Sequence, residues 1–117
     1  MARFERLEAW QACHRLTLEI YQIAKELPPD ERFALSQQLR RAAVSVCANI
    51  AEGSRKRGRA EFRRFLDIAN GSRTELRCLL LLVRDLDMIT ADQWETVEGL
   101  RRPAAYLLWR LLRSMEP

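Results

Sequence analysis

Four long segments in which apolar residues recur every three or four positions constrain this chain more than any other feature. They cover roughly residues 7–27, 30–53, 59–86 and 90–115, and short connections separate them. Only four glycines and four prolines occur in 117 residues, which favours long helices over many short strands. Short connections also make neighbouring helices antiparallel. The sequence therefore predicts one all-α domain over residues 1–117, folded as an up-down-up-down antiparallel four-helix bundle.

Local signals place the ends of these helices. The Pro-Pro pair at 28–29 should end the first helix, and Asp30 is expected to cap the second, with Gly53 closing it. The sequence TADQ at 90–93 is a capping box that should start the fourth helix. Gly71 falls inside the third helix, where glycine costs about 1 kcal/mol relative to alanine, so we expect close helix packing there.

The third and fourth helices are more apolar than a single bundle requires. Residues 79–83 read LLLLV, and residues 107–112 contain four leucines and a tryptophan. A helix that is apolar on every side must be buried on every side, whereas a four-helix bundle leaves each helix one outward face. We therefore expect a second subunit to cover this face. The alternative is a wide core stripe within a monomer.

Composition excludes several classes of protein. The net charge of +4 is mildly basic, and no apolar run is long enough to span a bilayer. The chain has no signal-peptide pattern, so a soluble cytoplasmic protein without a membrane role is expected. Its three cysteines (Cys13, Cys47 and Cys78) form no CxxC pair, and we expect them to be buried and reduced.

The densest charged feature is a basic segment at 55–64, which holds six basic residues against Glu61 alone and contains Gly58. A basic connection between two helices can hold phosphates through its side chains and the free amides at a helix end. The alternative is a solvated connector on a protein-interaction scaffold. No aromatic residue interrupts residues 53–59, so sequence readout is not suggested. The predicted nucleic-acid ligands are Arg55, Lys56, Arg57, Arg59, Arg63 and Arg64, joined by Arg101 and Arg102 near the C-terminus.

A polar stripe runs along the second and third predicted helices. If the turn between them centres near 56–57, paired residue numbers sum to about 113 in an antiparallel arrangement. Arg41 then lies near Ser72 and Glu75, and Glu52 lies near Glu61 and Arg64. We interpret the stripe as a buried or interfacial polar network that fixes helix register. Its members are Arg41, Ser45, Asn49, Glu52, Ser72 and Glu75.

The sequence lacks the residues that catalysis needs in one place. His14 is the only histidine, and the register puts no base beside Ser45. No glutamate belongs to the Glu-x-x-His pattern of di-iron bundles. We therefore expect no catalytic residue, no metal and no cofactor. The three hypotheses are a nucleic-acid-binding protein, a protein-interaction scaffold and a helix-bundle enzyme that uses a small molecule or a metal. The enzyme is the weakest of them.

Several motifs resemble a known family. Residues 38–46 (QLRRAAVSV), 49–53 (NIAEG), 61–69 (EFxxFLxIA) and 71–76 (GSxxEL) are similar to the four-helix bundle proteins related to those encoded by intervening sequences in bacterial 23S ribosomal RNA genes. The spacing of Phe4, Leu7 and Trp10 fits as well. The resemblance covers nearly the whole chain.

The resemblance implies a four-helix bundle that assembles into a ring-like homopentamer. More distantly similar proteins accompany diversity-generating retroelements, where such a pentamer binds nucleic acid and the reverse transcriptase. The expected partners are therefore further copies of this chain, RNA or DNA, and a reverse transcriptase or other protein. The leading hypothesis is a non-enzymatic, homo-oligomeric accessory protein that binds RNA or DNA through its basic surface.

Overall fold

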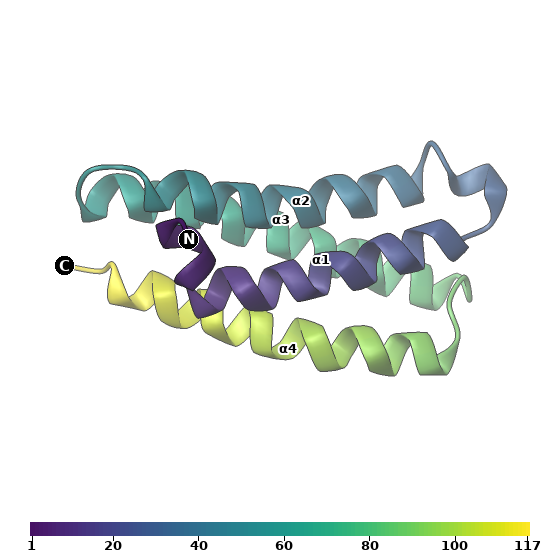
Figure 1. The fold of residues 1–117 in the computed structure, drawn as a ribbon. Coiled ribbons are helices and arrows are strands. Elements are labelled where there is room, and N and C mark those ends of the chain that lie inside the picture. The colour runs from purple at the N-terminus through teal and green to yellow at the C-terminus, as the bar shows by residue number, and fades with distance from the viewer.

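The computed structural model describes residues 1–117 and consists of helices only. The four α-helices are α1 (Glu8–Glu26), α2 (Leu35–Ser54), α3 (Arg59–Asp85) and α4 (Ala91–Ser114). Two short 3-10 helices, η1 (Arg3–Arg6) and η2 (Pro29–Glu31), precede α1 and α2. The α-helices alternate in direction along a body 44 Å long (Figure 1). Both termini and the α2–α3 turn lie at one end, and the other two connections lie at the opposite end, which confirms the four-helix bundle.

The core is built from one apolar stripe on each α-helix, as amphipathic helices require. Helix α2 packs most extensively on α3, and α1 packs on both α2 and α4. Helices α3 and α4 share the smallest contact, although they follow one another in the chain. The largest fully buried side chains are Ile20, Ile23, Leu39, Ile50, Leu66, Leu76, Leu80, Val83, Val97 and Leu108.

Two of the predicted helix ends can be compared with the observed ones. The capping box is confirmed, because Thr90 Oγ1 accepts a hydrogen bond from the Gln93 amide at 3.1 Å and Gln93 Oε1 accepts one from the Thr90 amide at 2.7 Å. The prediction that Asp30 caps α2 is wrong. The prolines at 28–29 instead start the 3-10 turn η2, which contains Asp30, and α2 begins only at Leu35.

Gly53 and Gly71 occupy opposite environments. Gly53 is buried in the last turn of α2, where an added Cβ would lie 2.8 Å from Phe65 Cβ and 2.9 Å from Phe62 Cδ1. Its role is thus to let α3 approach α2, and the left-handed backbone of the turn belongs to Gly58, with φ of 82°. Gly71 is exposed and has no atom within 4 Å of an added Cβ. The close packing predicted at Gly71 is therefore wrong within this chain.

A buried carboxylate joins α3 to α4, the pair of neighbouring α-helices with the fewest close backbone approaches. Glu98 on α4 is only 5% exposed, and its oxygens accept hydrogen bonds from Arg101 at 2.6 and 2.8 Å and from Arg77 of α3 at 2.5 Å. The Arg77 guanidinium also lies 5.4 Å from the centre of the Trp94 ring. The hydrogen bond from Arg101, with the charges of Arg101, Arg77 and Arg102, holds the pKa of Glu98 below its usual value against the opposing effect of burial.

The polar stripe joins α2 to α3, and its paired residue numbers sum to 116 and 117 rather than to about 113, so the register differs from the expected one by about one helical turn. Arg41 pairs with Glu75, the Ser45 and Ser72 hydroxyls lie 2.7 Å apart, and the Asn49 side-chain amide donates to Ser45 Oγ at 3.2 Å. The Arg41 and Glu75 side chains are 50% and 42% exposed. Within one chain, this end of the stripe is therefore a surface ion pair, whose contribution to stability is about 0–1 kcal/mol.

Replacing Gly53 with alanine should destabilise the fold by about 1–3 kcal/mol, because the new methyl group overlaps Phe62 and Phe65. The matched control is Gly71→Ala, which should stabilise the chain by up to about 1 kcal/mol through helix propensity alone. The measurement is urea unfolding of both variants. A neutral Gly53→Ala would contradict the close approach of α2 and α3.

Glu98→Gln should destabilise the fold by about 2–3 kcal/mol at pH 7, because it removes the charge that three arginines share. Glu75→Gln, at the exposed pair, should change stability by less than about 1 kcal/mol. Since the pKa of Glu98 is depressed on folding, its contribution is present above the ordinary value of 4.5 and is lost as the pH falls through the lower, folded-state value. Urea unfolding between pH 3 and pH 7 should therefore show the Glu98→Gln difference shrink in acid. A difference that stays constant with pH would refute this electrostatic role.

Candidate nucleic-acid interface

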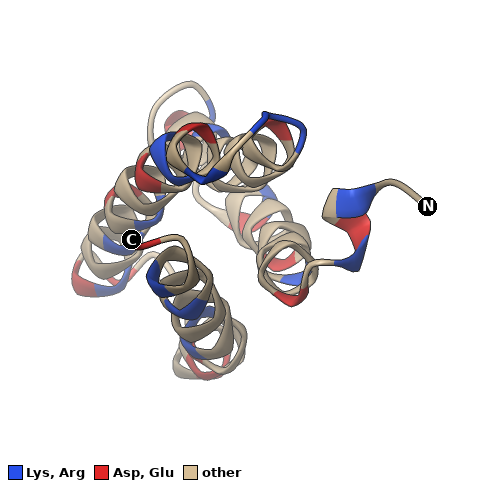
Figure 2. Cartoon of the chain, turned by 90° about the vertical axis from the view of Figure 1, so that its left-hand side faces the viewer, with Lys and Arg blue, Asp and Glu red and all other residues tan.

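Basic residues gather at the end of the molecule that carries the α2–α3 turn. Arg55, Lys56 and Arg57 form the turn, whose sharp reversal uses the positive φ of Gly58, and Arg59 begins α3. Figure 2 looks onto this end and shows the turn as a band of Lys and Arg. Cations after α2 are favourable because the C-terminal end of a helix carries partial negative charge. We name this surface the basic end, consisting of Arg3, Arg55, Lys56, Arg57, Arg59 and Arg63.

Arg3 joins the basic end from the start of the chain. Its Nη1 donates to the Ser54 carbonyl oxygen at 3.1 Å, and its guanidinium lies 5.3 Å from the centre of the Phe62 ring. Arg3 therefore binds a free carbonyl in the last turn of α2. A shallow hollow of about 310 Å³ lies beside it, lined by Arg3, Lys56, Gly58, Arg59, Phe62 and Met115. Sequence reasoning missed Arg3, because only the docking of η1 brings it to residues 51 positions away.

Four guanidinium groups of the basic end have no protein partner. Arg55, Arg57, Arg59 and Arg63 are exposed and take part in none of the ion pairs or side-chain hydrogen bonds of the structure. The first amides of α3 are also free of a side-chain cap. Unpaired guanidinium groups beside free helix-end amides can each bind a phosphate oxygen without breaking an existing bond.

Two further basic residues near the turn are partly engaged. Lys56 lies 3.5 Å from Glu52, and Arg64 lies 3.3 Å from Glu61. Both cations also lie over the Phe65 ring, at 5.2 and 4.6 Å from its centre. No hydrogen bond or ion pair joins Glu52 to Glu61 or Arg64. One-turn spacing along a single helix brings each of these acids closer to its own neighbour than to the facing helix.

Arg101 and Arg102 lie apart from the other predicted ligands. They are on α4, about 18 Å along the helix axis from its C-terminal end at the basic end. The Arg101 side chain is 16% exposed and holds Glu98, whose carboxylate raises the pKa of Arg101 through their hydrogen bond. Arg102 is 74% exposed and lies 3.5 Å from Glu98. The structure places the predicted ligands of the 55–64 segment close to one another. Arg101, in contrast, is already bonded to Glu98 of the same chain.

The remaining reactive side chains form no second chemical site. All three cysteines are free, and burial raises the pKa of the Cys13 thiol to about 12. Cys47 is half-buried, but Cys78 is exposed, so the prediction that all three are buried is wrong for Cys78. No group of three or more metal-ligating side chains converges. None of the helices combines the length and apolar character needed to cross a membrane.

Comparison with known proteins identifies the family to which this chain belongs. The model of the 23S rRNA-intervening sequence protein family matches residues 5–106. No curated protein matches the sequence. A solved structure from Bacteroides thetaiotaomicron, described as a protein of unknown function from the S23 ribosomal protein family, is 25% identical and superposes with a TM-score of 0.81, covering 90% of this chain and 95% of that chain. Since the family model spans most of the sequence and the fold agrees, this chain belongs to the 23S rRNA-intervening sequence protein family.

Proposed function

We propose that this protein is a non-enzymatic, homo-oligomeric accessory protein that binds RNA or DNA through its basic end. The observation that carries the proposal is the cluster of four unpaired guanidinium groups, Arg55, Arg57, Arg59 and Arg63, on one end of the bundle. Lys56 and Arg3 add charge beside them, and Arg102 on α4 can contact the same strand if it extends along the molecule. Arg101 is not among the proposed contacts, because moving it to a phosphate would remove the ion pair that it makes with the buried Glu98.

The chemistry of this surface favours a polyanion read without regard to sequence. Arginine binds phosphate through paired N–H donors, and contacts to phosphate position a nucleic acid but carry no base information. The only aromatic rings beside these cations, Phe62 and Phe65, already lie under Arg3, Lys56 and Arg64. Base stacking at this end is therefore not part of the proposal. The names of the family and of its solved relative refer to ribosomal RNA and ribosomal protein, which supports RNA as the first polyanion to test.

Exposed apolar side chains support self-association. Leu82 on α3, Leu86 directly after it, and Tyr106 and Trp109 on α4 are each about half exposed. Exposed apolar side chains of this size are typical of a surface that another protein covers. A ring would also repeat the basic end around one axis and so raise the local potential. We propose that the covering protein is a further copy of this chain.

If the protein is an oligomer, its mass in solution should be well above the mass of one chain. Light scattering of the purified protein should give about five times 13.7 kDa, the number implied by the family resemblance. Trp109→Ser with Leu86→Ser should lower this mass, because it removes apolar area from the proposed interface. A monomeric mass for the unmodified protein at micromolar concentration would contradict self-association.

Binding to RNA should be tight at low salt and should weaken steeply as salt rises, because bound cations release condensed counterions. Replacing Arg55, Lys56, Arg57 and Arg59 with glutamine should reduce the slope of log K against log salt by about 3, the value expected for four lost contacts to a single strand. The measurement is fluorescence anisotropy with a labelled RNA at several salt concentrations, on protein whose melting temperature is unchanged.

The matched control removes the same charge at four positions that are not proposed ligands, with glutamine at Arg15, Arg41, Arg73 and Arg84. It should keep most of the affinity if the basic end is the binding surface. Equal losses in the two variants would indicate net charge alone, and no binding near 50 mM salt would reject nucleic acid. Either result would favour the alternative function, a protein-interaction scaffold whose basic end serves solubility.

A further inference from the structure

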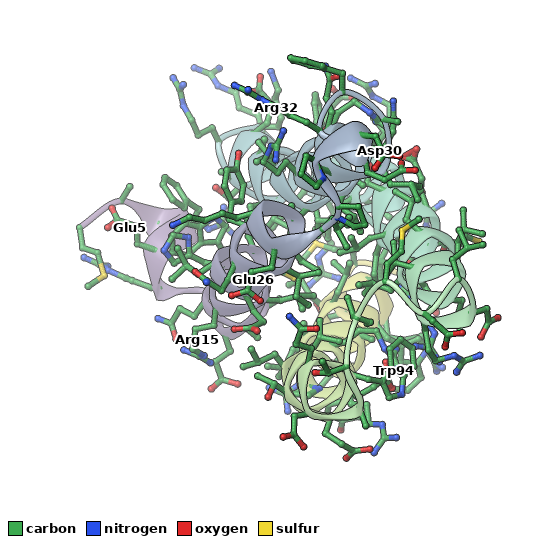
Figure 3. All side chains as sticks on the ribbon, turned by 90° about the vertical axis from the view of Figure 1, so that its right-hand side faces the viewer. Glu5, Arg15, Glu26, Asp30, Arg32 and Trp94 are labelled. Atoms are coloured by element: carbon green, nitrogen blue, oxygen red, sulfur yellow. The ribbon has the colours of Figure 1, made fainter.

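A second basic surface lies at the opposite end of the bundle, and it differs from the basic end in shape. It is a hollow of about 680 Å³ between the C-terminal half of α1, the η2 connection and the first turns of α2. Figure 3 looks onto this end and labels Arg32 beside the connection. The hollow is lined by Leu18, Tyr21, Gln22, Ala24, Lys25, Leu27, Pro28, Pro29, Arg32, Ser36 and Arg40.

Three cations line this hollow and no carboxylate does. Lys25 of α1, Arg32 of the connection and Arg40 of α2 make no ion pair in the structure, although acidic residues are common at this end. Glu26, the nearest acid in sequence to Lys25, accepts from Gln22 at 2.8 Å and also pairs with Gln93 of α4. The three positive charges come from three separate elements that line one hollow, and the Arg32 guanidinium also lies 5.1 Å from the centre of the Phe33 ring. Several cations around one hollow favour the binding of a compact, multiply charged anion.

The rest of the hollow is suited to a flat ring. Its floor is made of Ala24, Leu27 and Ser36, all buried, and the Ser36 hydroxyl is already bonded to the Ala24 carbonyl oxygen at 2.9 Å. Tyr21 lines the hollow and is 46% exposed. A half-exposed tyrosine can stack on a planar ring and offers a hydroxyl at its edge. A simple inorganic anion would contact the cations but would leave the apolar floor and the Tyr21 ring without a partner.

From this combination we infer that the hollow binds the nucleotide unit, with its phosphates held by Lys25, Arg32 and Arg40 and its base stacked on Tyr21. The unit can be a free nucleotide or the end of a single strand, and both carry the same phosphate-and-ring chemistry. This site lies toward the opposite end of the bundle from the basic end and does not depend on it.

The test is isothermal titration with ATP, pyrophosphate and a 5′-phosphorylated tetranucleotide at low salt. ATP should bind, and Lys25→Gln with Arg40→Gln should weaken binding of ATP and pyrophosphate by at least about tenfold, the effect of losing charge-assisted hydrogen bonds. The matched control, Arg15→Gln with Arg84→Gln, removes two exposed arginines outside the hollow and should leave the affinity for ATP unchanged. Figure 3 shows Arg15 on α1, well away from Arg32.

Tyr21→Ala separates a nucleotide site from a bare anion site. It should weaken ATP binding by about tenfold, the loss of one stacking contact, while leaving pyrophosphate binding unchanged. Tighter binding of the tetranucleotide than of ATP would identify a strand end as the ligand, and the reverse would identify a free nucleotide. Absence of ATP binding, equal losses in the charge variant and its control, or a Tyr21→Ala variant that binds ATP normally would each overturn the proposal.

The variant with glutamine at Arg55, Lys56, Arg57 and Arg59 distinguishes this proposal from the proposed function. It should bind ATP as the unmodified protein does, because the hollow lies at the other end. Conversely, Lys25→Gln with Arg40→Gln should leave the steep salt dependence of long RNA in place. Loss of ATP binding in the Arg55–Arg59 variant would show that the nucleotide binds at the basic end instead, which also overturns the proposal.

Discussion

The close packing of α3 on α2 at Gly53 determines much of this molecule. With no side chain at Gly53, Phe62 and Phe65 lie directly against the last turn of α2, and the two helices share the largest contact in the bundle. This approach places Ser45 against Ser72 and Arg41 against Glu75 farther along the pair. It also sets the tight turn that exposes Arg55 and Arg57. The same contact therefore serves the fold and presents the charges of the basic end.

Electrostatic bonds add to apolar packing where α3 and α4 meet. Helices α3 and α4 have the smallest contact, and there the buried Glu98 gathers Arg77, Arg101 and Arg102. A buried carboxylate is stable only when its charge is neutralised and its oxygens are bonded, so these arginines are held in place. Leu86, directly after α3, and Trp109 on α4 are half exposed. Buried polar bonds and exposed apolar side chains on these helices are consistent with the assembly proposed above.

The two ends of the bundle carry cations of different kinds. At the basic end the guanidinium groups project from a turn, as suits the contour of a long phosphate backbone. At the opposite end Lys25, Arg32 and Arg40 surround a hollow with an apolar floor, as suits a single small anion with a ring. The net charge of +4 does not reveal either basic surface, because acidic residues elsewhere in the chain offset their positive charge. The two proposed ligands, a long polyanion and a nucleotide, therefore follow from where the charges lie and not from the net charge.

The sequence alone determined the four helices, their antiparallel order and the run of cations at 55–64, because periodicity, breakers and charge runs are local in the chain. It could not determine that Arg3 docks on Ser54, that Arg101 is occupied by Glu98, or that Lys25, Arg32 and Arg40 face one hollow. It also misjudged Gly71 and Cys78, whose surroundings depend on which face of α3 the bundle covers. Each of these features requires helices to be placed beside one another in space. Only the tertiary structure decides such placements, since the pairing of a charge depends on distances that no local pattern encodes.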